Sequence, residues 1–158
     1  MTLPPYFSLP PSVDPKEIRK QSEELYRTKQ YYCSEAVIKV IRDTFCPDVP
    51  DCVIAMNSAF PIGMGGSGCA CGAVTGGMTA LGLIFGRTAP GDLQINLCMK
   101  LARELHDKFQ KENTCLCCRV LTKDMQHGSP EHMEQCIRFT GEITQATAEI
   151  ILRETKAP

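Results

Sequence analysis

Residues 71–86 read CGAVTGGMTALGLIFG, and this stretch decides the fold. Apolar or small residues occupy every side of the helix that it predicts, which is typical of a helix buried inside a protein. Gly72, Gly76 and Ala80 recur along it at intervals of four. Each glycine costs a helix about 1 kcal/mol, so we expect the close approach of another helix or of a cofactor to offset that cost.

Helical patterns continue on both sides of this stretch. Asp14-Pro15 and Ser129-Pro130 each place a capping residue before a proline, which predicts two helix starts. Asp51 and Gly91-Asp92 are further capping candidates. The expected helices cover about 14–29, 33–46, 51–58, 71–86, 92–111 and 130–154. Because no segment shows strand alternation, the sequence predicts an all-α fold. That fold is a compact bundle of five or six helices with a Gly-rich loop before the buried central helix.

The expected helix at 92–111 carries an apolar stripe at intervals of four residues. Its members are Leu93, Leu97, Leu101, Leu105 and Phe109. Charged residues lie largely outside this stripe, so we expect the stripe to face the core.

The domain organisation follows from composition. Residues 1–13 contain four prolines and predict an extended arm that packs on the body or on a partner subunit. Residues 14–158 predict a single helical Cys-rich redox domain.

The 17 basic and 18 acidic side chains nearly balance, and no basic stripe indicates nucleic-acid binding. The N-terminus lacks the pattern of a signal peptide, and Ala73–Gly86 is too short to span a membrane. We therefore expect a cytoplasmic protein.

Ten cysteines are the feature that departs most from ordinary composition. Residues 69–71 form a C-x-C pattern, and residues 115–118 read CLCC. Clustered thiolates in an unexported protein indicate metal or redox chemistry, and soft thiolates favour iron–sulfur, zinc or copper(I). Cys46, Cys52 and Cys98 stand alone and are interpreted as structural.

Three other patterns give weaker evidence for a functional site. Gly63, Gly65 and Gly68 match G-x-G-x-x-G, but no strand precedes them and no acidic residue follows at the ribose position, which excludes a dinucleotide fingerprint. The loop amides can instead favour a Cys71 thiolate at the start of the helix.

Arg119 follows Cys118, so the C-x-x-C-H pattern of covalent haem is absent. His132 and Cys136 share a helix face, and His132 is interpreted as a surface residue.

The chain resembles the C_GCAxxG_C_C family of redox-active proteins over about residues 24–150. The matching pieces are YCSEAV at 32–37, the glycine loop with CGAVTG at 71–76, LGL at 81–83, CRVL at 118–121, and Cys136. The resemblance implies an all-helical domain with functional residues Cys33, Cys71, Cys118 and Cys136. A similar domain accompanies an iron–sulfur centre in split-Soret cytochromes c.

The hypothesis that follows is a redox or electron-transfer protein whose four thiolates bind one iron–sulfur cluster, 2Fe–2S or 4Fe–4S, without covalent haem. Gly72 and Gly76 would lie beside the cluster. Whether the protein is an oxidoreductase or an electron carrier is left open. A redox protein and a second copy of this chain, forming a dimer, are the expected partners.

Two alternatives remain open. Cys69, Cys115 and Cys117 exceed the four-cysteine pattern and could add ligands, bind a second metal or act as resolving thiols. The first alternative is thiol–disulfide chemistry at Cys115/Cys118 or Cys71/Cys118. The second is a zinc-stabilised helical module that binds a protein partner.

Overall fold

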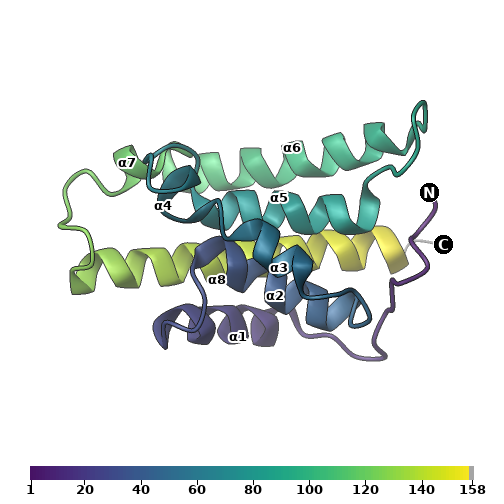
Figure 1. Cartoon of the computed structure of the whole chain (residues 1–158), viewed down its shortest axis with the longest axis horizontal. Coiled ribbons are helices and arrows are strands. Elements are labelled where there is room, and N and C mark those ends of the chain that lie inside the picture. Colours follow the sequence, from purple (N-terminus) through teal and green to yellow (C-terminus); the bar gives the residue numbers. More distant parts are fainter. Residues whose placement is uncertain (157–158) are drawn as a thin grey trace.

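The computed structural model describes residues 1–156, which form eight helical segments (Figure 1). The five longest are α1 (Pro15–Arg27), α2 (Cys33–Phe45), α5 (Gly72–Phe85), α6 (Gln94–Asn113) and α8 (Pro130–Lys156). The short ones are α3 (Cys52–Asn57), α4 (Pro61–Met64) and α7 (Cys118–Leu121). These residues contain no strand, only a bridge between Ala70 and Cys117. The predicted all-α bundle is confirmed; residues 157–158 of the expected domain lie outside the described part.

Helix α5 lies at the centre of the bundle. It contacts α2, α6 and α8, and Figure 1 shows it running between α6 and α8. Helix α1 packs along α8. The core between these helices is built from large side chains that are fully buried: Ile38, Ile41, Phe45, Leu81, Phe85, Leu101, Leu105 and Ile151. Within residues 1–156, no helix combines the length and the apolar character that crossing a membrane requires.

Side-chain capping accounts for the start of α1 and for the turn that leads into α6. The Asp14 carboxylate accepts a hydrogen bond from the Lys16 N–H at 2.9 Å, and the Asp92 carboxylate accepts one from the Gln94 N–H at 2.9 Å. The expectation that the Asp51 side chain caps α3 is wrong. Its carboxylate pairs instead with the guanidinium of Arg42 on α2.

The apolar stripe of α6 is buried only along part of its length. Leu101, Leu105 and Phe109 are buried against the core. Leu93 is 77% exposed because the helix starts at Gln94, so Leu93 lies before the first packed turn. The prediction that the stripe begins at Leu93 is therefore wrong.

The glycines of α5 permit close helix packing. A Cβ added to Gly76 would lie 2.6 Å from the carbonyl oxygen of Ser34 on α2, and one added to Gly77 would lie 2.7 Å from Leu105 on α6. Such separations are too short for real Cβ atoms. Helix–helix contact therefore supplies the offset that the glycine content of this helix demands.

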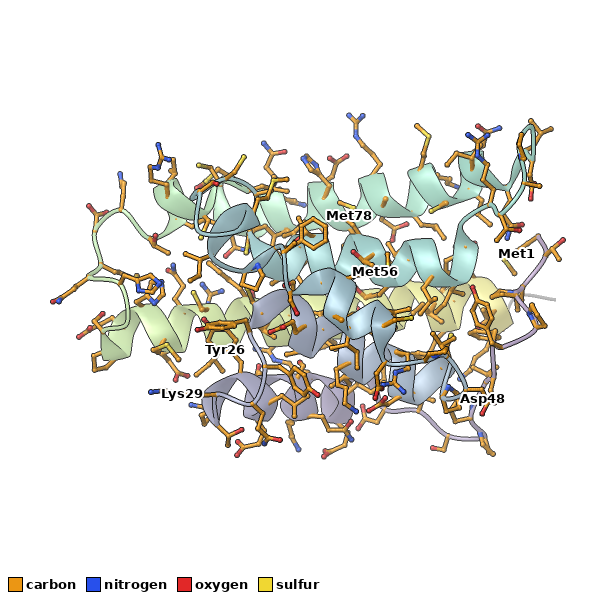
Figure 2. All side chains as sticks on the ribbon, in the orientation of Figure 1. Met1, Tyr26, Lys29, Asp48, Met56 and Met78 are labelled. Carbon is orange, nitrogen blue, oxygen red and sulfur yellow. The ribbon has the colours of Figure 1, made fainter. Side chains whose placement is uncertain are left out.

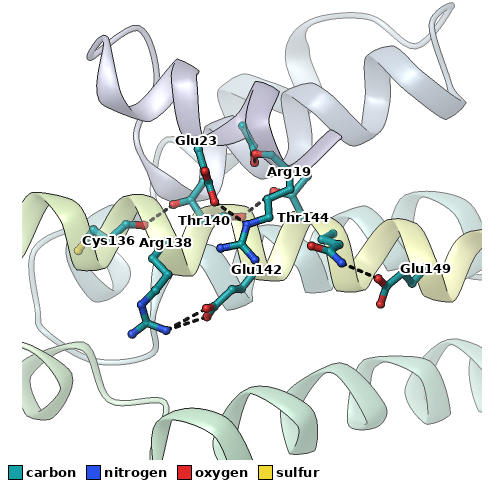
Figure 3. Close-up of polar contacts among 10 residues, drawn as sticks. Arg19, Glu23, Cys136, Arg138, Thr140, Glu142, Thr144 and Glu149 are labelled. Carbon is teal, nitrogen blue, oxygen red and sulfur yellow. Dashed lines mark hydrogen bonds and ion pairs between the residues drawn. The ribbon is translucent and has the colours of Figure 1, made fainter. Parts of the chain in front are cut away.

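Helices α1 and α8 meet in a similar way. A Cβ at Gly141 of α8 would overlap the Glu23 side chain of α1. Figure 3 shows this crossing, where Glu23 pairs with Arg19 at 2.6 Å and the hydroxyl of Thr140 donates to the carbonyl of Cys136 at 2.8 Å. The crossing fixes α8, and with it Cys136, against α1.

The proline-rich arm lies on the body of the protein. The Tyr6 hydroxyl donates to the carbonyl of Leu83 at 2.9 Å. The Ser8 N–H donates to the carbonyl of Phe45 at 2.7 Å, and the rings of Phe7 and Phe45 stack with centroids 6.2 Å apart. The arm thus covers the C-terminal ends of α2 and α5.

Candidate metal centre

Four cysteines that are distant in sequence line one small cavity of about 20 Å³. Cys33 is the first residue of α2, and Cys118 is the first residue of α7. Cys71 directly precedes α5, and Cys136 lies inside α8. Four separate helices therefore position the four sulfurs, and three of these helices begin at the cavity.

A short pairing of two loops brings Cys71 and Cys118 to the same place. The Cys71 N–H donates to the carbonyl of Leu116 at 2.8 Å, and the Arg119 N–H donates to the carbonyl of Gly68 at 3.0 Å. Gly63 has a φ of 70°, and a Cβ there would lie 2.7 Å from the Cβ of Cys118. The glycine loop therefore allows close approach as well as a left-handed turn.

Burial governs the acid–base properties of these thiols. Burial raises the pKa of Cys33 and of Cys71 to about 12, because a thiolate is poorly solvated there. Burial also raises the pKa of Cys136 to about 12, and the neighbouring Cys71 and Cys118 add to the rise. The cavity therefore disfavours free thiolates, and a bound cation would reverse this preference.

Backbone amides act in the opposite direction at two of the sulfurs. The N–H groups of Ile62 and Ser34 form hydrogen bonds that lower the pKa of Cys33, and those of Ala73 and Val74 do so for Cys71. Ile62 has a φ of 55°, which is unusual for a β-branched residue and typical of strained functional positions. Charge on these two sulfurs is thus partly compensated by the chain itself.

The two glycines expected beside a cofactor occupy different places. Gly72 lines the cavity, and a Cβ added there would overlap the sulfur of Cys33. Gly76 lies one turn further along α5 and packs against Ser34 and Val37 of α2. Gly72 therefore shapes the cavity directly, whereas Gly76 sets the distance between α2 and α5.

Tyr26 and His132 also line the cavity, and sequence reasoning missed both. The Tyr26 hydroxyl forms a hydrogen bond with Cys136. His132 is only 5% exposed, so its interpretation as a surface residue is wrong. The i, i+4 spacing of His132 and Cys136 was the available signal.

The protonation of His132 follows from its neighbours. The Gly128 N–H donates to Nδ1 of His132 at 3.3 Å, and Nε2 lies 3.8 Å from the Cys136 sulfur. Burial and the nearby His127 lower the pKa of His132, which favours the neutral ring. Because Nδ1 accepts a hydrogen bond, the proton sits on Nε2 and points toward Cys136.

The other six cysteines do not line this cavity. Cys69 is exposed. The thiol of Cys117 lies 3.3 Å from the carbonyl oxygen of Gly68, and the thiol of Cys115 lies 3.9 Å from the carbonyl oxygen of Cys117. Cys46 is fully buried near the arm, where burial raises its pKa to about 11. The extra loop cysteines thus lie beside the cavity without lining it.

The donor set suits a soft metal centre. Four sulfurs with no carboxylate among the lining residues match iron–sulfur or zinc chemistry. The absence of a Cβ at Gly72 leaves room for the sulfur of Cys33 in the wall of the cavity. Within residues 1–156, no three or more His, Cys, Asp or Glu side chains are arranged so that they could hold a metal ion as they stand. Side-chain adjustment on binding is therefore required.

The helical bundle and its cysteine-lined cavity define a cysteine-rich protein of the all-α class. Residues 31–150 match the family described as "Putative redox-active protein (C_GCAxxG_C_C)". The chain belongs to this family, and the description supports a redox role. Neither a curated protein nor a solved structure matches the chain.

Proposed function

We propose that this protein is an electron carrier that binds an iron–sulfur cluster through the thiolates of Cys33, Cys71, Cys118 and Cys136. The supporting observation is the convergence of these four side chains, from four helices, on one cavity. The redox description of the family agrees with this role.

The cluster would supply one-electron chemistry at a potential that its surroundings adjust. The chain contributes hydrogen bonds to the ligating sulfurs: amides at Cys33 and Cys71, and the Tyr26 hydroxyl at Cys136. Donors of this kind stabilise the more negative, reduced state and raise the reduction potential. The ring of Phe139 and the methyl group of Ala73 complete an apolar wall that limits access of water.

Zinc binding is the second candidate, and the size of the cavity favours it. About 20 Å³ corresponds to a single water molecule or ion. A cluster therefore needs the four side chains to move outward, whereas one zinc ion in a tetrahedral thiolate site needs a smaller adjustment. Thiol–disulfide exchange is disfavoured because a buried thiol with a raised pKa is a weak nucleophile.

The proposed setting is a reducing one. All ten cysteines are unpaired, which agrees with a cytoplasmic location where thiols stay reduced. A redox protein is the proposed electron partner.

We also propose a homodimer, because Leu93, Met56 and Met99 are large apolar side chains that are exposed. Sedimentation analysis would measure the oligomeric state.

Elemental analysis of protein purified without oxygen tests the cluster proposal. The expected result is brown protein containing iron and acid-labile sulfide, lost on exposure to air. Cys136→Ser should lower the iron content sharply. Cys98→Ser, which changes a cysteine of α6 outside the cavity, should leave it unchanged.

Two results would decide against the cluster. Equimolar zinc without sulfide, lost in Cys136→Ser, would favour the zinc site. Protein that holds neither iron nor zinc after reconstitution would reject both metal proposals.

A further inference from the structure

A larger pocket of about 460 Å³ adjoins the cysteine cavity. Tyr26, Ile62 and His132 line both spaces, so these three side chains form the wall between them. The labelled residues Tyr26 and Lys29 in Figure 2 mark the end of the molecule where this pocket lies. A molecule in the pocket would be separated from Cys136 by a single layer of side chains, Tyr26 and His132.

The pocket is lined largely by aromatic rings. Tyr31, Tyr32 and His127 join Tyr26 and His132 in its walls. The rings of His127 and His132 lie 4.7 Å apart, and those of Tyr26 and Tyr32 meet edge to face at 6.5 Å. The volume lies within the range of small-molecule sites, about 300–1,000 Å³. Such walls favour a planar, conjugated ligand that stacks on them.

The pocket offers the ammonium group of Lys29 as a hydrogen-bond donor, whereas the carboxylate among its lining residues is already engaged. The carboxylate of Glu35 is already engaged by the Tyr32 N–H at 2.9 Å and by the Ser58 hydroxyl at 2.5 Å. The ammonium group of Lys29 makes no ion pair within residues 1–156. A complementary ligand would therefore present acceptor oxygens.

We propose that this pocket binds a quinone, a planar ring that carries carbonyl oxygens. The aromatic walls accommodate the ring, and the Lys29 ammonium group and the tyrosine hydroxyls are donors for the oxygens. The role of the quinone as the small-molecule partner of the cysteine centre rests on the proposed function. Binding itself does not require a loaded centre, so the two proposals fail independently.

Equilibrium dialysis of the reduced, metal-free protein against tetramethyl-1,4-benzoquinone under nitrogen tests the proposal. All ring positions of this probe are substituted, which hinders addition of thiols to the ring. Because a quinone can also oxidise two thiols to a disulfide and leave as the hydroquinone, the free-thiol content must be the same before and after dialysis. We expect saturable binding of one molecule per chain. Tyr31→Ala and His127→Ala, at the outer walls, should each weaken binding roughly 2- to 10-fold.

Two controls sharpen the test. Gln21→Ala changes a separate surface pocket between α1 and α2, which has no aromatic lining, and should leave binding unchanged. Tetramethylbenzene, the same ring without oxygens, should bind at least 10-fold more weakly. Circular dichroism checks that each variant is folded. The proposal is overturned if binding is not saturable. It is also overturned if folded Tyr31→Ala and His127→Ala bind the quinone as tightly as the wild type, or if the hydrocarbon binds as tightly as the quinone.

Discussion

The two ends of α5 use glycine for different purposes. At the N-terminal end, Gly72 leaves room for the sulfur of Cys33, and Gly76 leaves room for the backbone of α2. Near the C-terminal end, a Cβ added to Gly82 would meet nothing within 4 Å. Glycine is thus a geometric requirement at positions 72 and 76 and dispensable at position 82.

The largest expected effect is at Gly72. In Gly72→Ala the added methyl group would overlap the Cys33 sulfur and crowd the carbonyl oxygen of Phe60. We expect metal affinity to fall by about 10-fold or more, as for the loss of groups that orient ligands. Iron and zinc content after reconstitution measures this. Wild-type loading of folded Gly72→Ala would show that Cys33 does not hold the metal.

Gly76→Ala should destabilise the fold without touching the cavity. The new Cβ would lie 2.6 Å from the carbonyl oxygen and 2.9 Å from the Cα of Ser34, and backbone atoms cannot rotate away. Overpacking costs about 1–3 kcal/mol, more than the helix gains from alanine. Urea denaturation should show a net loss of stability. An unchanged or increased free energy of unfolding would mean that α2 and α5 are further apart than described.

Gly82→Ala is the matched control for the other end of α5. With open space around the new methyl group, the helix gains propensity at no packing cost. The free energy of unfolding should rise by about 0.5–1 kcal/mol. Metal content should not change. A loss of stability in the same urea experiment would reveal a contact at this face and weaken the comparison.

The smallest effect is expected at the ion pair between α6 and α8. Arg153 contacts both carboxylate oxygens of Glu104, at 2.6 and 2.8 Å. Both side chains are partly exposed, so Arg153→Ala should cost only about 0.2–1 kcal/mol. Metal content should be that of the wild type.

The same pair has a defined pH dependence. The hydrogen bond from Arg153 lowers the pKa of Glu104 below its ordinary value of 4.5. The pair therefore stabilises the protein fully above pH 4.5, and this contribution disappears as the pH falls through the lowered pKa. Urea denaturation of wild type and Arg153→Ala should converge at acid pH. A difference that grows on acidification would contradict the assignment.

Local signals accounted for most of the helical architecture. Asp14 and Pro15 start α1 as their pattern predicted, and the apolar 71–86 stretch became the central helix. Asp51 did not follow its local signal, because Arg42 from another helix offers its carboxylate a partially buried partner. Tertiary contacts of this kind are invisible to capping rules, which consider only neighbours in sequence.

The candidate site was only partly accessible to sequence reasoning. The four cysteines followed from a family resemblance, whereas their meeting point depends on how loops at 68–71 and 116–119 pair. The burial of His132 depends on the loop before α8, where Gly128 folds back onto the ring. The i, i+4 spacing places His132 and Cys136 on one face of α8, but it does not show that this face is buried in the first turn of the helix.

Mapping of thiol protection tests the central claim most directly. Protein loaded without oxygen and protein stripped by a chelator are alkylated in parallel, and each cysteine is quantified by mass spectrometry. The account predicts that Cys33, Cys71, Cys118 and Cys136 become more reactive together when the metal is removed, while Cys98 and Cys52 do not change. If the metal protects Cys69, Cys115 and Cys117 instead, or protects none of the four, the proposed centre is contradicted.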